Sequence, residues 1–414
     1  MQRNPIAKLV CSNCQFGFRS GRSTEDQLLL TYSHIVREID SGKVVDVVFL
    51  DFSKAFDVVC HQILLEKLRH LSFCPRIVNW IGDFLTERSM YVSVAGCSSE
   101  QMPVLSGVPQ GSVLGPLLFL IYVNSIADGI SCKWYAYADD FKVFLQYSAD
   151  ERVTSGNRIQ HDLDLLCSRS LSWNLKLNSN KCVVMRFGCS YEDGGSGYFI
   201  NDSELQLVKS HRDLGILVDH QLKFHLHVDT IVSKASQMAN QLLRATICRE
   251  PLFMVTLFIS HIRPLLDYCS TVWNLGYVGD LDKLEKVQRR WTKQVVGLRD
   301  VPYESRLRQL CLYFICGRLL RGDLIKIWKA FHADNDVGLS QIFERQSHNA
   351  TRGHRFKLSV PRCRLEIRRR FLSTRCVISW NALPAEIVES TSIDAFKSLL
   401  DIYFSDRFFD IRGT

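Results

Sequence analysis

Residues 134–145 read WYAYADDFKVFL, with apolar runs on either side of the adjacent aspartates Asp139 and Asp140. Aromatic and β-branched runs of this kind predict strands. We therefore expect a hairpin with the two aspartates at its tip, because Asp tolerates turn geometry. Two exposed carboxylates held close together suit a divalent cation, which prefers oxygen ligands. An ordinary Asp-Asp turn has the same short sequence, so the motif needs support from elsewhere in the chain.

A third aspartate follows an apolar run earlier in the chain. Residues 44–50 read VVDVVFL, which predicts a strand buried on both faces, and Asp51 comes directly after it. A turn or helix-cap role for Asp51 is the alternative, because residues 56–71 have a helical pattern. Together with Asp139 and Asp140, Asp51 completes a set of three carboxylates that can hold two Mg²⁺ ions. Such a pair of ions catalyses phosphoryl transfer by stabilising the attacking and leaving oxygens.

A glycine- and proline-rich loop lies between these aspartates. Residues 106–116 read SGVPQGSVLGP and precede an apolar stretch, residues 117–126, which we expect to be a helix with Pro116 in its first turn. A loop of this composition lets backbone approach a ligand closely and directs a helix N-terminus at anions. Many strand-to-helix loops look similar, so the loop gains meaning only beside the carboxylates.

Four blocks follow one another along the chain: QFGFRSGRST at 15–24, FLDFSKAFD at 49–57, SGVPQGSVLGPLLF at 106–119 and YADD at 137–140. In this order and spacing they resemble the reverse transcriptases of non-LTR retrotransposons, the jockey-like LINE group in particular. The resemblance implies an α+β fold: a right-hand polymerase palm, which is an antiparallel sheet with packed helices, plus partial fingers, a helical thumb and a mostly helical C-terminal region. It implies an RNA-directed DNA polymerase that extends a DNA primer on an RNA template with deoxynucleoside triphosphates.

The resemblance also assigns roles to single residues. Asp51, Asp139 and Asp140 match the metal-binding carboxylates, and the backbone carbonyl of Phe52 would complete the shell of two Mg²⁺ ions, for which Mn²⁺ can substitute. Phe56 matches a bulky residue that excludes a 2′-hydroxyl, although a core aromatic would look the same. The other matches are with residues that contact nucleotide, template or primer: Gln110 and Gly111 in the loop, Arg19, Gly21 and Arg22 in the fingers, and Tyr137 beside the primer terminus.

Two further blocks continue the resemblance. Ahead of the first, Ile159, Leu163 and Leu166 have helical spacing, which predicts a helix. Residues 173–181 (WNLKLNSNK) make Lys181 a candidate catalytic proton donor to the departing pyrophosphate, with an ordinary loop lysine as the equal alternative. Residues 211–218 (HRDLGILV) resemble a primer grip, in which Leu214 and Gly215 would let backbone approach the primer strand. The residues alone predict only a turn leading into a strand.

Basic residues cluster in the C-terminal half. Lys286, Arg289, Arg290 and Lys293 have spacing that places all four on one side of a helix. Such a stripe can follow a phosphate backbone, with salt-dependent affinity. The equal alternative is a solvated helix face paired with the nearby acids Asp282 and Glu285. Residues 351–375 hold nine Lys or Arg and one acidic residue, and include the run RRR at 368–370.

Composition is consistent with a nucleic-acid partner but does not prove it. The chain has 414 residues, 46% of them hydrophobic, a net charge of +8 and 15 cysteines. We see no secretory signal, so we expect an intracellular protein with free thiols, in the nucleus and cytoplasm as the family implies. No apolar stretch reaches the roughly 18 residues of a membrane span. Oligomeric state is not predicted.

We expect four segments: a fingers remnant (1–40), a palm with interleaved fingers helices (41–222), a helical thumb (223–296) and a basic, mostly helical C-terminal region (297–414). The thumb follows from Val228, Ile231 and Ala235, which have helical spacing. The chain starts almost at the first matched block, so we expect an N-terminally truncated family member with incomplete fingers and no endonuclease. The alternative to an active polymerase is a catalytically inactive remnant, or a co-opted nucleic-acid-binding protein, on the same fold.

Overall fold

The computed structural model describes residues 12–189, 196–332, 338–346 and 353–405. It is a mixed α/β structure of two compact units: the described residues of Met1–Gln27 and Gly42–Lys209 form one, and those of Leu28–Ser41 and Ser210–Thr414 form the other. Helix α2, Thr24–Asp40, begins in the first unit and continues in the second. These two units do not coincide with the four expected segments, so the names fingers, palm and thumb stay predictions.

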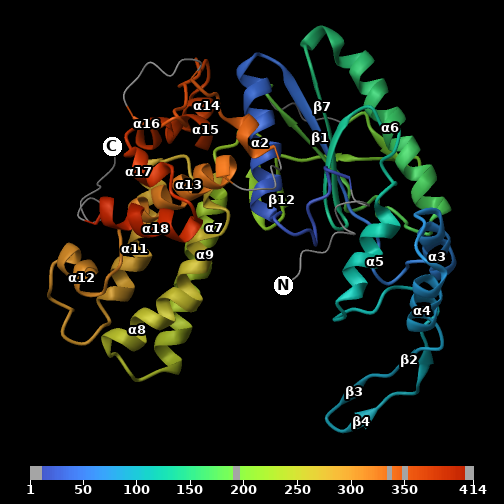
Figure 1. Ribbon diagram of the computed structural model, residues 1–414, viewed down its shortest axis with the longest axis horizontal. Coiled ribbons are helices and arrows are strands. Elements are labelled where there is room, and N and C mark those ends of the chain that lie inside the picture. The colour runs from blue at the N-terminus through green and yellow to red at the C-terminus, as the bar shows by residue number, and fades with distance from the viewer. Residues whose placement is uncertain (1–11, 190–195, 333–337, 347–352, 406–414) are drawn as a thin grey trace. The chain divides into compact units, whose positions relative to one another are not determined.

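A five-stranded sheet forms the centre of the first unit, with the strand order β11-β8-β1-β7-β6 (Figure 1). Its strands are β1 (Val44–Leu50), β6 (Lys133–Tyr137), β7 (Asp140–Tyr147), β8 (Val183–Phe187) and β11 (Gln206–Leu207). All neighbours pair antiparallel except β8 and β11, which pair parallel. β1 lies in the middle, and its residues from 45 to 50 are all buried, which confirms the predicted strand buried on both faces.

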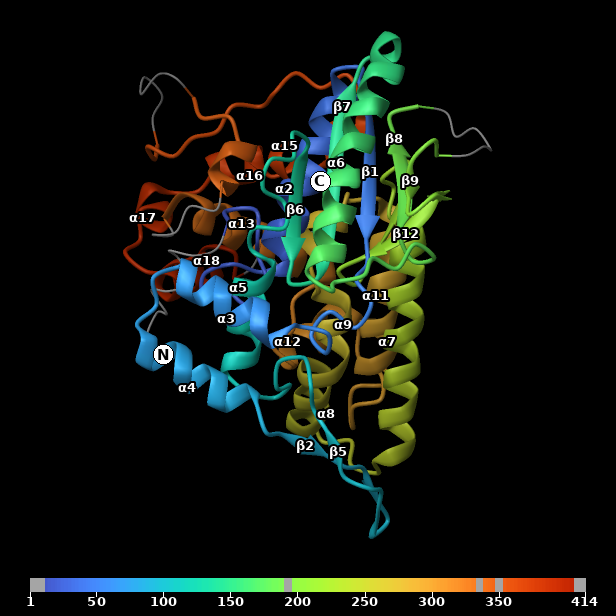
Figure 2. The same cartoon turned by 90° about the vertical axis from the view of Figure 1, so that its right-hand side faces the viewer.

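Two helices cover one face of this sheet. They are α5 (Leu114–Val123) and α6 (Arg152–Ser172), and Figure 2 shows α6 running along the strands. Val48 and Leu50 of β1 share a hydrophobic core with α5 and α6 residues, including those at the predicted helical positions 159, 163 and 166. Pro116 is the third residue of α5, where its missing N–H leaves no hydrogen bond unmade. The helix therefore fixes where the preceding glycine-rich loop ends.

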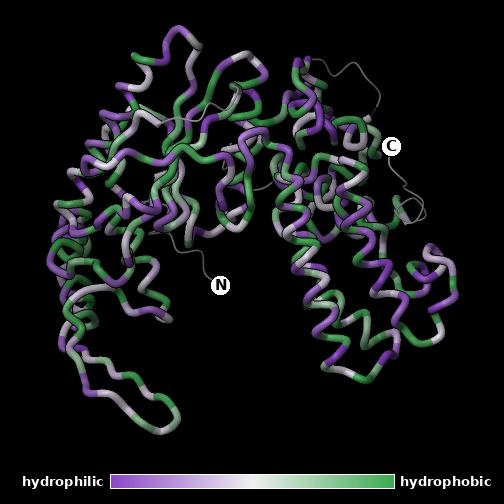
Figure 3. The backbone as a smooth tube through the Cα atoms, turned by 180° about the vertical axis from the view of Figure 1, so that it is seen from behind, coloured by the Kyte–Doolittle hydropathy of each residue, from purple (hydrophilic) through white to green (hydrophobic). Residues whose placement is uncertain are grey.

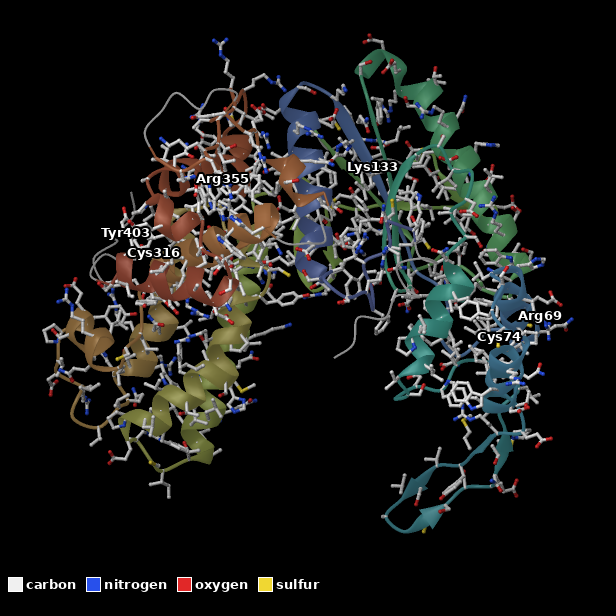
Figure 4. The ribbon with its side chains drawn as sticks, in the orientation of Figure 1. Arg69, Cys74, Lys133, Cys316, Arg355 and Tyr403 are labelled. Atoms are coloured by element: carbon white, nitrogen blue, oxygen red, sulfur yellow. The ribbon has the colours of Figure 1, made fainter. Side chains whose placement is uncertain are left out.

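A helical pair and a projecting hairpin extend the first unit. Helix α3 (His61–His70) packs against α4 (Pro75–Leu85), and Arg69 and Cys74, labelled in Figure 4, flank the turn between them. The hairpin beyond α4 contains short, exposed strands: β2 (Ser89–Met90), β3 (Ser93–Val94), β4 (Cys97–Ser98) and β5 (Met102–Pro103). The remaining short elements are η1 (Ala149–Glu151), β9 (Phe199–Ile200) and β10 (Ser203–Glu204).

The expected helix over residues 56–71 is wrong in its first part, because α3 begins only at His61. Residues 52–58 form a turn in which the backbone N–H groups of Asp57 and Val58 both donate to the carbonyl of Lys54. The carbonyls of Phe56 and Val59 accept hydrogen bonds from the loop at 107–108. Those acceptors are therefore unavailable to a helix, and the turn serves as a docking edge for the glycine-rich loop.

The second unit is mostly helical. Its elements after α2 are β12 (Ser210–Asp213), β13 (Ile216–Asp219), α7 (His225–Ala245), α8 (Pro251–Leu257), the π-helix η2 (Phe258–Ile262), α9 (Arg263–Asp267), α10 (Ser270–Trp273), α11 (Val278–Thr292), α12 (Tyr303–Gln309), α13 (Ile315–His332), η3 (Leu339–Ile342), α14 (Glu366–Arg370), α15 (Leu372–Arg375), α16 (Val377–Asn381), α17 (Ala385–Val388) and α18 (Ile393–Tyr403). α7 confirms the helix predicted from residues 228, 231 and 235. Figure 3 shows apolar and polar residues alternating along these helices, as amphipathic packing requires. In the described parts of the chain, no helix is long and apolar enough to cross a membrane.

Candidate active site

Antiparallel pairing brings the three aspartates to one end of the sheet. In the β1–β7 ladder Leu50 pairs with Phe141, so the next step of the register sets Asp51 opposite Asp140. The tip of the β6–β7 hairpin differs from the prediction. Tyr137 pairs with Asp140 as the first residue of β7, which leaves Ala138 and Asp139 as the two turn residues. A two-residue hairpin loop needs positive φ, and Ala138 supplies it with a φ of 58°.

Asp51 and Asp139 interact electrostatically. Burial, in the first place, and the negative charge of Asp51 raise the pKa of the Asp139 carboxyl above its usual range, against a backbone hydrogen bond that lowers it. A like charge has this effect only at short range, since the ionised form of each carboxyl disfavours that of the other. The strand register brings Asp139, in the hairpin turn, and Asp51, directly after β1, to the same end of the sheet.

Asp51 is held from both sides by the segment that precedes β8. Its carbonyl accepts a hydrogen bond of 2.8 Å from the N–H of Asn178, and its N–H lies 3.4 Å from the sulfur of Cys182. Its carboxylate lies 3.4 Å from Nζ of Lys181. Oδ2 of Asp51 is buried and accepts no hydrogen bond. The candidate proton donor Lys181 thus lies directly beside a candidate metal ligand.

The chemistry of these groups fits a divalent cation, although they do not form a complete ligand set by themselves. Among the described residues, no group of three or more His, Cys, Asp or Glu side chains is arranged to hold a metal ion. Nζ of Lys181 lies 3.4 Å from the buried Oδ2 of Asp51 without forming a hydrogen bond, and burial raises the pKa of the neighbouring Asp139 carboxyl, so the negative charge of this site is only partly compensated. A cation with oxygen ligands removes that charge. Phe52 packs its side chain inward, opposite Leu177.

Phe56 is held by two other aromatic rings. It stacks on Phe119 of α5, with ring centroids 4.1 Å apart and planes 20° apart, and meets the edge of Phe18 at 6.1 Å. Its side chain is half-buried, so one part of the ring belongs to the core and the other reaches the surface. Phe56 can therefore be a core aromatic and still be available, as predicted, to exclude a 2′-hydroxyl.

The loop that carries Gln110 and Gly111 is docked on Asp57. The side-chain amide of Gln110 donates to the carboxylate of Asp57 at 2.8 Å, and the hydroxyl of Ser106 donates to its carbonyl at 2.8 Å. Gly107 has a φ of 88°, and a Cβ there would lie 2.7 Å from the carbonyl oxygen of Asp57. Only glycine allows this close approach. Gln110 is thus fixed in place before any ligand arrives.

Arg19 and Arg22 bind their own segment. The guanidinium of Arg19 donates to the backbone carbonyls of Ser12 and Gln15, and that of Arg22 donates to those of Asn13 and Gln15. Both side chains are half-buried. In this structure they order residues 12–16, and their contact with nucleotide or template phosphates stays a prediction. Tyr137 ends β6 and is also half-buried.

A cavity of about 510 Å³ is lined in part by residues that follow Asp51 in the chain. Lys54 and Lys176 line it together with Ser53 and other residues, and both lysines are exposed. Ser53 donates its N–H to the carbonyl of Lys176, next to the bridge that pairs Phe52 with Leu177. In that extended pairing, Ser53 lies two residues, or roughly 7 Å, along the chain from Asp51. Two lysines therefore line a cavity that begins two residues along the chain from Asp51.

The sequence pattern of a known family covers this whole site. The family described as "Reverse transcriptase (RNA-dependent DNA polymerase)" matches residues 4–225, more than half of the 414 residues. The chain belongs to the reverse transcriptase family. Reverse transcriptases generally use divalent metal ions and bind nucleic acid, in keeping with the acidic site just described.

Curated relatives of this reverse transcriptase come from insect mobile elements. The RNA-directed DNA polymerase from mobile element jockey of Drosophila melanogaster is 28% identical over 307 residues, which cover 72% of this chain and 33% of that protein. The probable RNA-directed DNA polymerase from transposon BS of Drosophila melanogaster is 26% identical over 323 residues, 75% of this chain and 34% of that protein. The chain spans about one third of the length of these relatives.

Solved structures give a weaker likeness. The apo telomerase from Candida tropicalis matches with a TM-score of 0.39 and 11% identity, over 82% of this chain and 59% of that one. At that score the likeness carries no argument about the fold.

The predicted primer grip of this reverse transcriptase is a hairpin in the second unit. Leu214 and Gly215 form the turn between β12 and β13, with φ values of 44° and 91°. The hydroxyl of Tyr268 donates to the carbonyl of Leu214 at 2.9 Å, and a Cβ at Gly215 would lie 3.3 Å from the Tyr268 ring. The turn is therefore supported from one side by Tyr268, and glycine keeps that contact free of a clash.

The four basic residues of α11 are exposed, as the helical spacing predicts, while Leu284, Val287 and Trp291 on its other side are buried. One of the two acids expected in the alternative, Glu285, accepts hydrogen bonds from the hydroxyl of Tyr303 and the N–H of Ile315. Burial raises the pKa of Glu285 and the positive charge of Arg289 acts to lower it, so this acid also interacts with the stripe. Within the described residues, no ion pair is recorded for the stripe's side chains; Arg289 lies over the Tyr303 ring at 4.7 Å.

The run at 368–370 is not a free cationic patch. Arg368 is buried and donates to the hydroxyl of Ser373, while Arg369 and Arg370 pair with Glu366. Part of the basic segment 351–375 lies outside the described residues. The contact of the basic stripe at 286–293 with phosphates stays a prediction.

Two residues of the site were quoted within the matched blocks but received no role from sequence reasoning. Asp57 holds Gln110, and Gln15 holds the hairpin turn at Ala138. No periodicity or composition marks either residue. Their partners lie 53 and 123 positions away in the chain, so only the folded structure shows the contacts.

Proposed function

We propose that this reverse transcriptase is the catalytic region of a non-LTR retrotransposon RNA-directed DNA polymerase, which extends a DNA primer on an RNA template. The observation that carries the proposal is the convergence of Asp51, Asp139 and Asp140 at one end of the sheet, with Asp51 and Asp139 in electrostatic contact. The mobile-element relatives, whose names state this activity, support it. In this proposal the sheet of the first unit is the palm, and helices of the second unit form the thumb.

The three carboxylates, with the backbone carbonyl of Phe52, would hold two Mg²⁺ ions, which Mn²⁺ can replace. When bound, such ions supply activation of the primer hydroxyl and stabilisation of the leaving oxygen. The chain's own contribution begins with Asp51, whose carbonyl and N–H are held by the segment at 178–182 and whose Oδ2 lies 3.4 Å from Nζ of Lys181. Preorganised charge of this kind needs little rearrangement when substrate arrives.

The neighbouring residues are suited to an incoming deoxynucleoside triphosphate. Phe56, stacked on Phe119, would block a 2′-hydroxyl, because the stacking leaves the ring little freedom to turn aside. Gln110, held by Asp57, would lie with Gly111 against the nucleotide. The lysines of the neighbouring cavity would attract its phosphates. Lys181, beside Asp51, would give the proton on Nζ to the departing pyrophosphate.

Several residues of the chain are suited to contact primer or template. Tyr137 would lie beside the primer terminus, Leu214 and Gly215 would present backbone to the primer strand, and the α11 stripe would follow phosphates. Arg19 and Arg22 would reach the template or nucleotide only by exchanging backbone partners for phosphates, a favourable exchange because phosphate is charged. Such an enzyme would work wherever element RNA and target DNA are found, in the cytoplasm and nucleus.

Primer extension tests the proposal. Purified chain is expected to extend a labelled DNA primer on an RNA template with deoxynucleotides and Mg²⁺, and to lose this activity with EDTA. Asp139→Ala should abolish extension, whereas Asp83→Ala, an exposed aspartate on α4, should not affect it. If the unaltered chain binds RNA but never extends a primer, the catalytically inactive remnant or co-opted binding protein is the correct description instead.

A further inference from the structure

The N-terminal segment of the first unit lies along the edge strand that leads to the catalytic turn. Gln15 forms a parallel bridge with Ala136 of β6, the N–H of Phe16 donates to the carbonyl of Ala136 at 2.8 Å, and the N–H of Ala136 donates to the carbonyl of Cys14 at 2.9 Å. The next residue, Gly17, comes so close that a Cβ there would lie 2.3 Å from the backbone nitrogen of Ala138. The segment thus follows β6 up to the turn.

The side chain of Gln15 binds both polar backbone groups of Ala138. Its amide oxygen accepts from the N–H of Ala138 at 2.8 Å and from that of Gly17 at 2.8 Å, and its NH₂ donates to the carbonyl of Ala138 at 3.1 Å. Gln15 is only 5% exposed, and Ala138 is 8% exposed. At this buried position a side-chain amide takes the place of a neighbouring strand, because it offers one acceptor to the N–H and one donor to the carbonyl of the same residue.

Ala138 needs this support because its conformation is unfavourable. A φ of 58° brings Cβ of a non-glycine residue close to backbone, and such residues persist only where their surroundings determine the geometry. Asp139 follows directly, so the direction of its carboxylate depends on the backbone of Ala138. The two hydrogen bonds between the Gln15 amide and the backbone of Ala138 hold this conformation.

We propose that Gln15 is a positioning residue, which holds the Ala138 peptide so that the Asp139 carboxylate faces Asp51 in readiness for metal. The expected effect of Gln15 on catalysis rests on the proposed function. Its expected effects on metal affinity and on the conformation of the turn at Ala138 do not. The amide is specific for the task. Glutamate would keep the acceptors and lose the donor, and methionine, of similar length, would lose both.

Metal binding by the full chain, without nucleotide or primer, is the first measurement. Mn²⁺ titrated into the protein and followed by electron paramagnetic resonance should bind on the order of tenfold more weakly to Gln15→Met, with Gln15→Glu intermediate. The matched control is Gln288→Met, another buried glutamine amide, which donates to the Tyr303 hydroxyl and the Tyr313 carbonyl in the second unit. It should lower thermal stability without changing Mn²⁺ affinity.

Two further measurements complete the test: hydrogen exchange at the Ala138 turn, and recovery of Mn²⁺ affinity by a second substitution. Hydrogen exchange at the Ala138 amide should speed up in Gln15→Met and not in Gln288→Met. Adding Ala138→Gly to Gln15→Met should restore much of the Mn²⁺ affinity, because glycine adopts positive φ without strain. In primer extension, kcat should fall about 10- to 100-fold, as small misplacements of reacting groups cause, with the KM for nucleotide little changed.

The proposal is overturned if Gln15→Met binds Mn²⁺ as tightly as the unaltered chain. It is also overturned if Gln288→Met, with the same melting temperature as Gln15→Met, loses as much Mn²⁺ affinity. Absence of primer extension in the unaltered chain would instead count against the proposed function, and the Mn²⁺ and exchange measurements would still decide the role of Gln15. If Gln15→Met does not fold, Gln15→Glu carries the comparison, since it keeps the two accepted hydrogen bonds.

Discussion

Asp46 is in β1, five positions before Asp51. Its replacement by alanine should strongly destabilise the first unit. The carboxylate has 0% exposure and accepts from Nε and Nη2 of Arg186 at 2.7 and 2.9 Å, from the Tyr147 hydroxyl at 3.1 Å and from the Tyr198 hydroxyl at 2.6 Å. Asp46→Ala leaves the guanidinium of Arg186, whose side chain is 12% exposed, without its counter-charge. Breaking a buried pair in this way costs about 3–5 kcal/mol.

Urea unfolding followed by far-UV circular dichroism and tryptophan fluorescence measures the effect. The control is Asp394→Ala, which breaks a pair with Lys397 in which the aspartate side chain is 86% exposed, and it should cause no measurable change. A double variant, Asp46→Leu with Arg186→Met, removes both charges and should be less destabilised than Asp46→Ala, because no buried charge is left unpaired. If Asp46→Ala matches the exposed control, the reasoning about this buried network is refuted.

Three further predictions concern the site and the basic stripe. In metal-free buffer, Asp139→Asn should raise the free energy of unfolding at neutral pH, because burial and the charge of Asp51 raise the pKa of Asp139 and its ionised form therefore destabilises the fold. The gain should shrink as the pH falls below about 3.9, the pKa of an unfolded Asp, because the carboxyl is then protonated in both the folded and the unfolded state; a gain independent of pH would contradict this. Phe56→Val should increase ribonucleotide incorporation relative to deoxynucleotide by at least about tenfold, measured as a ratio of kcat/KM. A difference of about 1.4 kcal/mol in transition-state free energy between the two substrates suffices for this change. An unchanged ratio would show that Phe56 does not exclude the 2′-hydroxyl. Lys286→Ala with Lys293→Ala should reduce the slope of log affinity for nucleic acid against log salt by roughly 1–2, whereas Lys283→Ala on the same helix, already paired with Asp229, should leave the slope unchanged.

Much of the fold follows from local patterns. The β-branched run at 44–50, the helical spacing at 159, 163 and 166, and the position of Pro116 each predicted an element that the structure contains. The helix expected from residue 56 failed for a non-local reason, because the loop at 107–108 takes the carbonyls of Phe56 and Val59 as acceptors. Periodicity cannot register a hydrogen-bond partner 50 or so positions away.

The sequence by itself determined the chemistry that is present: three carboxylates, an aromatic residue at 56, a lysine at 181 and a family pattern over residues 4–225. Only the tertiary structure decided their geometry. The pairing of β1 with β7 sets Asp51 against the hairpin, and the amide of Gln15 reaches Ala138 across 123 positions to hold the turn. The physical reason is that the sequence gives the type of side chain at each position directly. The direction of a carboxylate depends on hydrogen bonds that form only after distant segments of the chain have packed together.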